Sequence, residues 1–289
     1  MTEYDLERQG NLLYTIEDLL SILARLLAPD GCPWDRSQTH ESLRRNMIEE
    51  AYETVDAIDT GLPARIKDEL GDVLLQVGLH AALAERDGEF TFTDVTDNIC
   101  RKLISRHTHV FGKDEADSPD AVISVWDKNK MLEKGHTSFS QTLLDVPTGL
   151  PALMRADKLQ KRAAKAGFDW PDAQGALLKV TEELAEIEEA LTENGKSLFG
   201  MLSAEKEPAV YEQVEGEIGD FLFAAVNYAR LLGIDPEVAL NRTSRKFVRR
   251  FAEVEALTSG TDKALDEMTL EEMDRLWDAV KALEKKEVN

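Results

Sequence analysis

The sequence contains one arrangement of motifs twice, and this internal repeat limits the possible folds more than any other feature. Five motifs of the first half recur in the same order in the second half, and all four tryptophans fall in matched pairs. The pairs are Gly31-Cys32-Pro33-Trp34-Asp35 with Gly167-Phe168-Asp169-Trp170, Glu49-Glu50-x-x-Glu53 with Glu182-Glu183-x-x-Glu186, Glu69-Leu70-Gly71-Asp72 with Glu217-Ile218-Gly219-Asp220, Lys102-x-x-x-Arg106 with Lys246-x-x-x-Arg250, and Trp126-Asp127-x-x-Lys130 with Trp277-Asp278-x-x-Lys281. Five matches in order indicate that one unit has been duplicated.

The repeated unit is expected to be helical. Strand signals are nearly absent, since the only clean alternation of apolar and polar residues is Phe90 to Thr93. Helix starts are predicted at Ser118-Pro119, at Asp235-Pro236 and at the capping box formed by Thr269 and Glu272. The sequence therefore predicts an all-α fold of two tandem helical repeats. We expect an N-terminal domain over 1–134, a Gly, Ser, Thr and Pro-rich linker over 135–149, and a C-terminal domain over 150–289.

Composition excludes several classes of function. The 289 residues include 56 Asp and Glu against 34 Lys and Arg, a formal net charge of -22, which disfavours stable binding to nucleic acid. The longest apolar stretch, Leu19 to Ala28, is interrupted by Arg25 and is too short to span a bilayer. The acidic N-terminus does not resemble a secretory signal, so a cytoplasmic location is expected. Two cysteines cannot build a disulfide framework or a four-cysteine zinc site.

Carboxylates at helical spacing are the first candidates for chemistry. On a helix, Glu182, Glu183 and Glu186 share one arc beside an apolar stripe, and Glu217 and Asp220 share a face of the next helix. If the two faces meet, the like charges require a cation, and oxygen ligands suit Mg²⁺ or Mn²⁺, which commonly bind substrate phosphates as well. A single acidic helix face is usually only solvated, but both features occur twice, which favours a metal site.

Basic and aromatic residues supply the complementary half of this hypothesis, because substrates with several phosphates are usually clamped by Lys and Arg. Lys246 and Arg250 share a helix face, and their spacing recurs in the first repeat. Trp277 followed by Lys281 one turn later suits stacking on a base and contact with a phosphate, although a lone Trp on a helix is more often part of the core. Lys179 precedes the acidic motif of the second repeat, whereas Asn46 stands at that position in the first.

Taken together, these motifs resemble the MazG family of nucleoside triphosphate pyrophosphohydrolases. The resemblance covers nearly the whole chain, including the segments 106–111 and 246–251. It implies four-helix bundles completed by a homodimer, a requirement for Mg²⁺, with Mn²⁺ as a substitute, and hydrolysis of NTPs and dNTPs between the α and β phosphates to monophosphate and pyrophosphate. The physiological role would be house-cleaning or control of the nucleotide pool. The insertion over about 195–208 and Thr108 depart from the family pattern.

The resemblance also implies roles for individual residues of this chain. It makes Glu182 the water-orienting base and predicts four metal ligands, Glu183, Glu186, Glu217 and Asp220. It predicts five substrate contacts, Lys179, Lys246, Arg250, Trp277 and Lys281. The equivalent carboxylates of the first repeat, Glu50, Glu53, Glu69 and Asp72, form a second candidate site, which we expect to be weak or structural because it lacks the lysine.

Two other functions remain open at the level of sequence. One is a non-catalytic acidic helical module that senses nucleotides or binds a protein partner, although such a scaffold gives no reason for the repeated basic residues. The other is a hydrolase of different organic phosphates, which the motifs do not distinguish. The sequence does not reveal the preferred base or which phosphorus is attacked.

Overall fold

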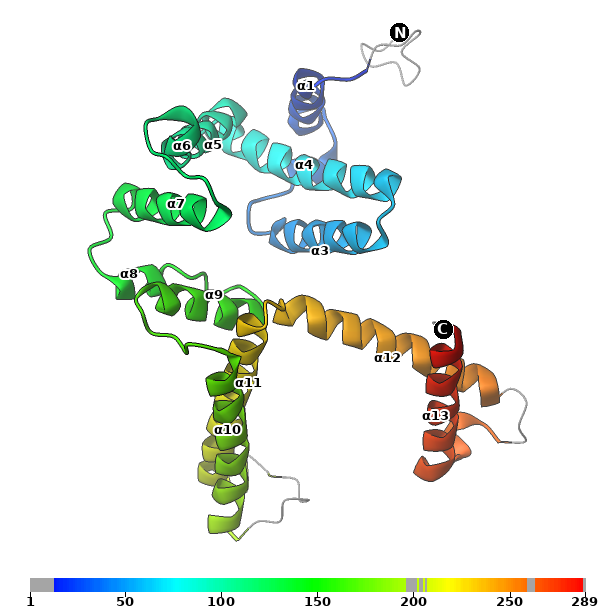
Figure 1. Ribbon diagram of the computed structural model, residues 1–289. Helices are drawn as coiled ribbons and strands as arrows, with labels where there is room; N and C mark the ends of the chain where they lie inside the picture. The colour runs from blue at the N-terminus through cyan, green and yellow to red at the C-terminus, as the bar shows by residue number, and fades with distance from the viewer. Residues whose placement is uncertain (1–12, 196–201, 203–204, 206, 259–262, 288–289) are drawn as a thin grey trace. The chain divides into compact units, whose positions relative to one another are not determined.

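A computed structural model describes residues 13–195, 202, 205, 207–258 and 263–287. The contacts between residues divide the chain into two compact units, Met1–Leu132 and Glu133–Asn289. Within the described residues all regular structure is helical and no strand occurs (Figure 1). The predicted all-α fold of tandem repeats is confirmed. Completion of the helical bundles by a second copy of the chain stays a prediction.

The first unit is built around a helical hairpin. A leucine core formed by Leu23, Leu43, Leu79 and Leu83 joins this hairpin to the first helix of the chain. The hairpin consists of α3 and α4, which turn into one another at Gly61, whose φ of 66° is a left-handed conformation that favours glycine. The helices of the unit are α1 (Ile16–Leu27), α2 (Pro33–Arg36), α3 (Arg44–Thr60), α4 (Pro63–Arg86), α5 (Phe92–Arg106), α6 (Thr108–Phe111) and α7 (Pro119–Glu133).

The second unit repeats this plan with a longer hairpin. Its two helices, α10 and α11, are the most extensively packed pair of the unit, α9 packs on α11, and α13 packs chiefly on α12 (Figure 1). Ala190, Leu191 and Val214 form a small core near the turn of the hairpin. The helices are α8 (Phe139–Leu144), α9 (Ala152–Lys165), α10 (Ala173–Glu193), α11 (Pro208–Leu231), α12 (Pro236–Thr258) and α13 (Leu270–Glu287), with a 3₁₀ turn over Leu265–Glu267 before the last.

Three predicted helix starts are confirmed by their capping bonds. The Ser118 hydroxyl accepts a bond from the N–H of Ala121 at 3.3 Å, and the Asp235 carboxylate accepts one from Val238 at 3.0 Å. Thr269 forms the predicted reciprocal capping box at the start of α13. These bonds satisfy N–H groups that have no partner inside the helix, which explains why the sequence marks these positions.

Two segments expected to be non-helical contain or begin helices in the structure. The alternating stretch Phe90 to Thr93 leads into α5, because Thr91 caps that helix. The segment 135–149, expected to be a linker, contains α8, which Ser138 caps and which packs against α9. Most of the insertion over about 195–208 lies outside the described residues. No helix in the described part of the chain combines the length and the apolarity that crossing a membrane requires.

Candidate functional site

Three of the four predicted ligands meet in the second unit. Glu183 and Glu186 lie one turn apart on α10, and Glu217 reaches them from α11, so that one carboxylate oxygen of each lies within 4.8 Å of the others. The side chain of Glu183 is buried, and those of the other two are half-buried. The packing of the hairpin therefore joins two acidic motifs that are 31 residues apart in the sequence.

The electrostatics of this cluster reflect the crowding of like charges. The pKa of the Glu186 carboxyl is raised because it shares a hydrogen bond with Glu183, because it is partly desolvated, and because the charge of Glu183 repels its own. All three ligands offer oxygen, and neither cysteine nor histidine is among them. This donor set fits a hard divalent cation such as Mg²⁺.

A lysine lies against the cluster. Lys179 is one turn before Glu183 on α10, and its ammonium lies 2.6 Å from the Glu183 carboxylate and 2.9 Å from that of Glu182. The pKa of Lys179 is raised, first by the hydrogen bond to Glu183 and then by the one to Glu182. Lys179 thus compensates the buried charge of Glu183, while Glu182, the predicted base, lies at the exposed edge of the cluster.

The fourth predicted ligand, Asp220, lies one turn after Glu217 on α11 and has an exposed side chain. Its carboxylate is not among the three that meet. Residues three apart share a helix face, so Asp220 points to the same side of α11 as Glu217. The structure brings three predicted ligands together and leaves the fourth one turn away.

A similar cluster occurs in the first unit. Oxygens of Glu50 on α3 and of Glu69 and Asp72 on α4 also lie within 4.8 Å of one another, whereas Glu53 is outside this group. The pKa of Glu50 is raised, first by desolvation and then by the charge of Asp72 and the neighbouring glutamates. Each repeat thus brings together three of its four motif positions, but the two repeats leave out different members.

Apart from Lys179, the predicted substrate contacts of the second unit form a group of their own on α12 and α13. The Arg250 guanidinium lies 5.9 Å from the centre of the Trp277 ring and binds the Glu284 carboxylate at 2.6 Å, while Lys281 pairs with Asp278 at 2.6 Å. Lys246 has an exposed side chain. Among the described residues, no ion pair joins this group to the carboxylate cluster.

The same arrangement of arginine and tryptophan occurs in the first unit. Arg106 lies 5.3 Å from the centre of the Trp126 ring, and these two residues are the sequence counterparts of Arg250 and Trp277. The motif pairs found in the sequence therefore recur as contacts between side chains. This agreement supports the alignment of the two repeats.

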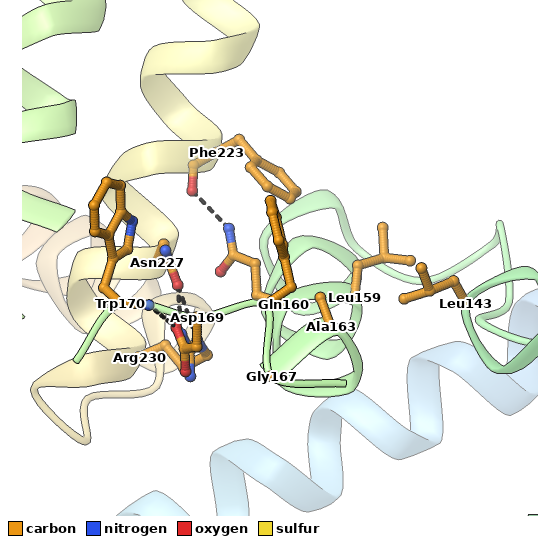
Figure 2. Close-up of a pocket in the computed structure, with 11 residues that line it drawn as sticks. Leu143, Leu159, Gln160, Ala163, Gly167, Asp169, Trp170, Phe223, Asn227 and Arg230 are labelled. Atoms are coloured by element: carbon orange, nitrogen blue, oxygen red, sulfur yellow. Dashed lines mark hydrogen bonds and ion pairs between the residues drawn. The ribbon is translucent and has the colours of Figure 1, made fainter. Parts of the chain in front are cut away.

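One cavity of the second unit was not predicted from the sequence. It has a volume of about 570 Å³ and lies between α9, the loop 167–170 and the C-terminal half of α11 (Figure 2). Apolar side chains form most of its wall, and its polar lining residues are Gln160, Asp169, Asn227 and Arg230. The signal that could have revealed it is the presence of Ala163 and Asn227 at positions where the first repeat has Leu27 and Leu79.

Comparison with known proteins places these observations in a family. A model described as the MazG nucleotide pyrophosphohydrolase domain matches residues 38–111 and again residues 173–254. These two matched segments include α3 with α4 and α10 with α11, the hairpins that carry the carboxylate clusters. Each matched segment lies within one copy of the duplicated unit and includes its two carboxylate motifs and its Lys-x-x-x-Arg motif.

Whole-chain relatives agree with the family model. The chain is 42% identical over 274 residues to the nucleoside triphosphate pyrophosphohydrolase/pyrophosphatase MazG of Thermotoga maritima, covering 95% of this chain and 98% of that protein. It is 38% identical over 270 residues to the nucleoside triphosphate pyrophosphohydrolase of Escherichia coli strain K12, covering 93% and 98%. A Bacillus subtilis protein named uncharacterized protein YabN is 43% identical over 281 residues, 96% of this chain and 54% of that protein. The two matched domains and the extent of these similarities show that the chain belongs to the MazG nucleotide pyrophosphohydrolase family.

Proposed function

We propose that this chain is a Mg²⁺-dependent nucleoside triphosphate pyrophosphohydrolase that converts NTPs and dNTPs to monophosphate and pyrophosphate. The observation that carries the proposal is the meeting of Glu183, Glu186 and Glu217 at a site that offers only oxygen ligands. Such a set suits a cation that is shared with substrate phosphates. The names of the relatives from Thermotoga maritima and Escherichia coli point to the same reaction.

Glu183, Glu186 and Glu217 would hold the metal, with Asp220 as a fourth ligand from the same face of α11. Bound there, Mg²⁺ would offset the charge of the phosphates and lower the pKa of the attacking water. The buried Glu183 fixes the position of the site, because its side chain is held between α10 and α11. Asp220 requires only a change of side-chain conformation to approach it from one turn away.

Two further residues of α10 would take part in the hydrolysis. Glu182, at the exposed edge of the cluster, would accept a proton from the water whose oxygen bonds to phosphorus, while the bridging P–O bond breaks and pyrophosphate leaves. Lys179 would exchange its bond to Glu183 for one to a phosphate oxygen and so stabilise the charge that develops there. The lysine that compensates the cluster would thus become a substrate contact.

The basic group on α12 and α13 would bind the rest of the triphosphate. Lys246 has an exposed side chain and Lys281 a partly exposed one, so both can turn towards an anion. Arg250 is held by Glu284 and would orient Trp277 through its contact with the ring. Because no ion pair among the described residues joins this group to the carboxylates, we propose that a second copy of the chain contributes to each site.

Exposed apolar side chains support this homodimer. The α10–α11 hairpin leaves Leu178, Leu184 and Leu222 with 64%, 49% and 49% of their surface exposed, on helices whose other faces are packed. Exposed apolar faces of this kind mark interaction surfaces. A second hairpin packed on this face would complete a four-helix bundle, which light scattering would report as a dimer.

The first repeat would have a weaker or structural role. Its cluster of Glu50, Glu69 and Asp72 has the same oxygen ligands, but Asn46 stands where the second repeat has Lys179. Without a cation to compensate the carboxylates or to contact phosphate, this site would contribute less to turnover. A divalent ion bound there would still join α3 to α4.

The experiment that tests the proposal is product analysis by anion-exchange chromatography, after incubation with each NTP and dNTP in the presence and absence of Mg²⁺. We expect monophosphate and pyrophosphate only with Mg²⁺, and neither from the Asp220→Asn variant. Glu215→Gln changes an exposed carboxylate on the same helix that lies outside the cluster, and it serves as the matched control. Binding of triphosphates without cleavage by the wild-type protein would instead support the nucleotide sensor.

A further inference from the structure

Two half-buried histidines of the first unit share a hydrogen bond. The Nδ1 atom of His40, in the segment between α2 and α3, lies 2.7 Å from the Nδ1 atom of His80 on α4. The two rings are parallel to within 1°, and their centroids are 5.0 Å apart. At this distance one nitrogen carries the hydrogen and donates it, while the other accepts with its lone pair. The bond therefore requires that at least one of the two rings is neutral.

A second proton on the pair removes this bond. One added proton is tolerated, because a charged ring can donate to a neutral one in a charge-assisted bond. When both rings are charged, each Nδ1 carries a hydrogen, and two positive donors face one another. Burial also disfavours the second charge, and the pKa of His80 is lowered first by burial and then by the charge of His40.

No described carboxylate is bonded to the pair. Neither ring has a hydrogen-bond or ion-pair partner other than its fellow histidine among the described residues. The charge of His40 also acts on Glu41 beside it and on Asp87 at the end of α4. The pKa of each is lowered chiefly by another partner, its own backbone N–H for Glu41 and Arg86 for Asp87. A second positive charge on the pair is therefore left without a bonded anion.

The elements around the pair supply little further negative charge. Arg86 binds Asp87 at 3.0 Å, and on α5 Asp94 bonds to Thr91 and Asp97 to Arg101. Arg25 on α1 binds Asp30 at 2.9 Å. The other charged residues next to the segment are Asp35 and Arg36 on α2 and Arg44 and Arg45 on α3. With three arginines against one aspartate, this last group does not favour a doubly charged pair.

The histidine bond fastens the segment 37–43 to α4. The other side-chain hydrogen bonds of this segment are local, such as those of Gln38 to the carbonyl of Trp34 and of Ser42 to Gln38. Among the described residues, the bond between His40 and His80 is the one hydrogen bond from the segment to α4. The segment ends at the fully buried Leu43 and leads directly into α3. Loss of the bond therefore frees the chain that begins α3.

This pair belongs to the first repeat alone. The position 148 residues after His80 is Tyr228, by the offset of the acidic motif on α4. The motifs on either side of His40 have offsets of 136 and 133 residues, which lead to Ala176 and Ala173. The fold of a repeat therefore does not require two histidines here, and the second repeat has no counterpart of the bond.

We propose that His40 and His80 form a pH-sensitive latch, which holds the segment 37–43 on α4 while the pair carries at most one proton and releases it when both rings are charged. The sign follows from linkage: the released form binds one proton more than the closed form. The latch is therefore fully closed above the ordinary histidine pKa of about 6.5 and opens as the pH falls below it. Each pH unit below that value favours the open form by about tenfold. This inference is independent of the proposed catalytic activity.

Hydrogen exchange of the full chain, followed by mass spectrometry, tests the latch. After correction for the intrinsic effect of pH, exchange in the segment 37–43 should be about tenfold faster at pH 5.5 than at pH 7.5. His40→Asn places an uncharged amide near the position of Nδ1, and this amide can donate to a neutral His80 or accept from a charged one. The variant should lose the acceleration. His136→Asn removes a histidine that faces Asp145 in the second unit, and it serves as the control that keeps the acceleration.

The comparison of the two proteins decides the outcome. An acceleration in the wild type that exceeds that of His40→Asn by about fivefold or more supports the latch, and a smaller difference overturns it. Circular dichroism at pH 7.5 checks that the variant folds. If it does not, ¹⁵N NMR of the histidine rings in the wild type gives the answer. Two rings that titrate in coupled steps about one pH unit apart or more support the shared proton, and independent titration of all five overturns it.

Discussion

Lys179→Met should increase the affinity of the second repeat for a divalent cation and weaken its binding of triphosphate. In the structure the Lys179 ammonium lies 2.6 Å from the buried Glu183 carboxylate, so a cation that binds Glu183 must displace the lysine. Methionine keeps most of the length of the side chain and removes its charge. The competition ends, and the affinity for metal should rise.

The magnitude follows from the exposure of the two partners. The Lys179 side chain is 36% exposed and that of Glu183 is 6% exposed. Fully exposed pairs contribute about 0.2–1 kcal/mol, whereas breaking a buried pair costs about 3–5 kcal/mol. For this intermediate pair, screened by solvent on the lysine side, we take about 1–2 kcal/mol. The dissociation constant for metal should therefore fall by about 5- to 30-fold.

Calorimetric titration with Mn²⁺ in the absence of nucleotide measures this change. Lys161→Met is the matched control, because Lys161 also pairs with a carboxylate four residues away on its helix, Asp157, at 2.7 Å. In parallel, KM for NTPs should rise in Lys179→Met, since the contact to phosphate is lost. An unchanged or weaker affinity for Mn²⁺ in this variant would refute the idea that lysine and metal compete for Glu183.

Three further predictions concern the two carboxylate clusters, Glu284 and Gly175. Glu183→Gln should abolish turnover while the fold persists, whereas Glu50→Gln should reduce turnover by less than tenfold. Steady-state kinetics of the two variants distinguishes a principal site from a weaker one. The pKa of Glu284 is lowered from 4.5 to about 2 by its bonds to two arginines of α12, so its stabilising effect is complete above pH 4.5 and is lost as the pH falls towards 2. The difference in melting temperature between wild type and Glu284→Gln should vanish over that range. Gly175→Ala would place a Cβ 2.6 Å from the Trp170 ring. The middle of the usual overpacking range, about 2 kcal/mol, less a helix gain of about 1 kcal/mol leaves a net cost of about 1 kcal/mol, so Tm should fall by about 2–4 °C and tryptophan fluorescence should change.

Local signals in the sequence predicted the helices well. Ser118, Asp235 and Thr269 begin helices where expected, because capping depends on residues within three positions of the cap. The alternation from Phe90 to Thr93 was ambiguous for the same reason. Four residues cannot distinguish a strand from the capped start of a helix, and the bond from Asp94 to Thr91 decides it.

The sequence by itself determined the duplication through the order of its motifs. It determined the all-helical class and the acidic face of each helix through the spacing of residues along that helix. Only the tertiary structure decided which of the carboxylates meet. Asp220 is left out in one repeat and Glu53 in the other, because distances between helices depend on packing. Packing also placed Arg250 against Glu284 and left a cavity lined by Ala163 and Asn227, whose counterparts in the first repeat are Leu27 and Leu79. Contacts between distant segments have no period in the sequence, and for that reason periodicity predicted the acidic faces but not the pocket.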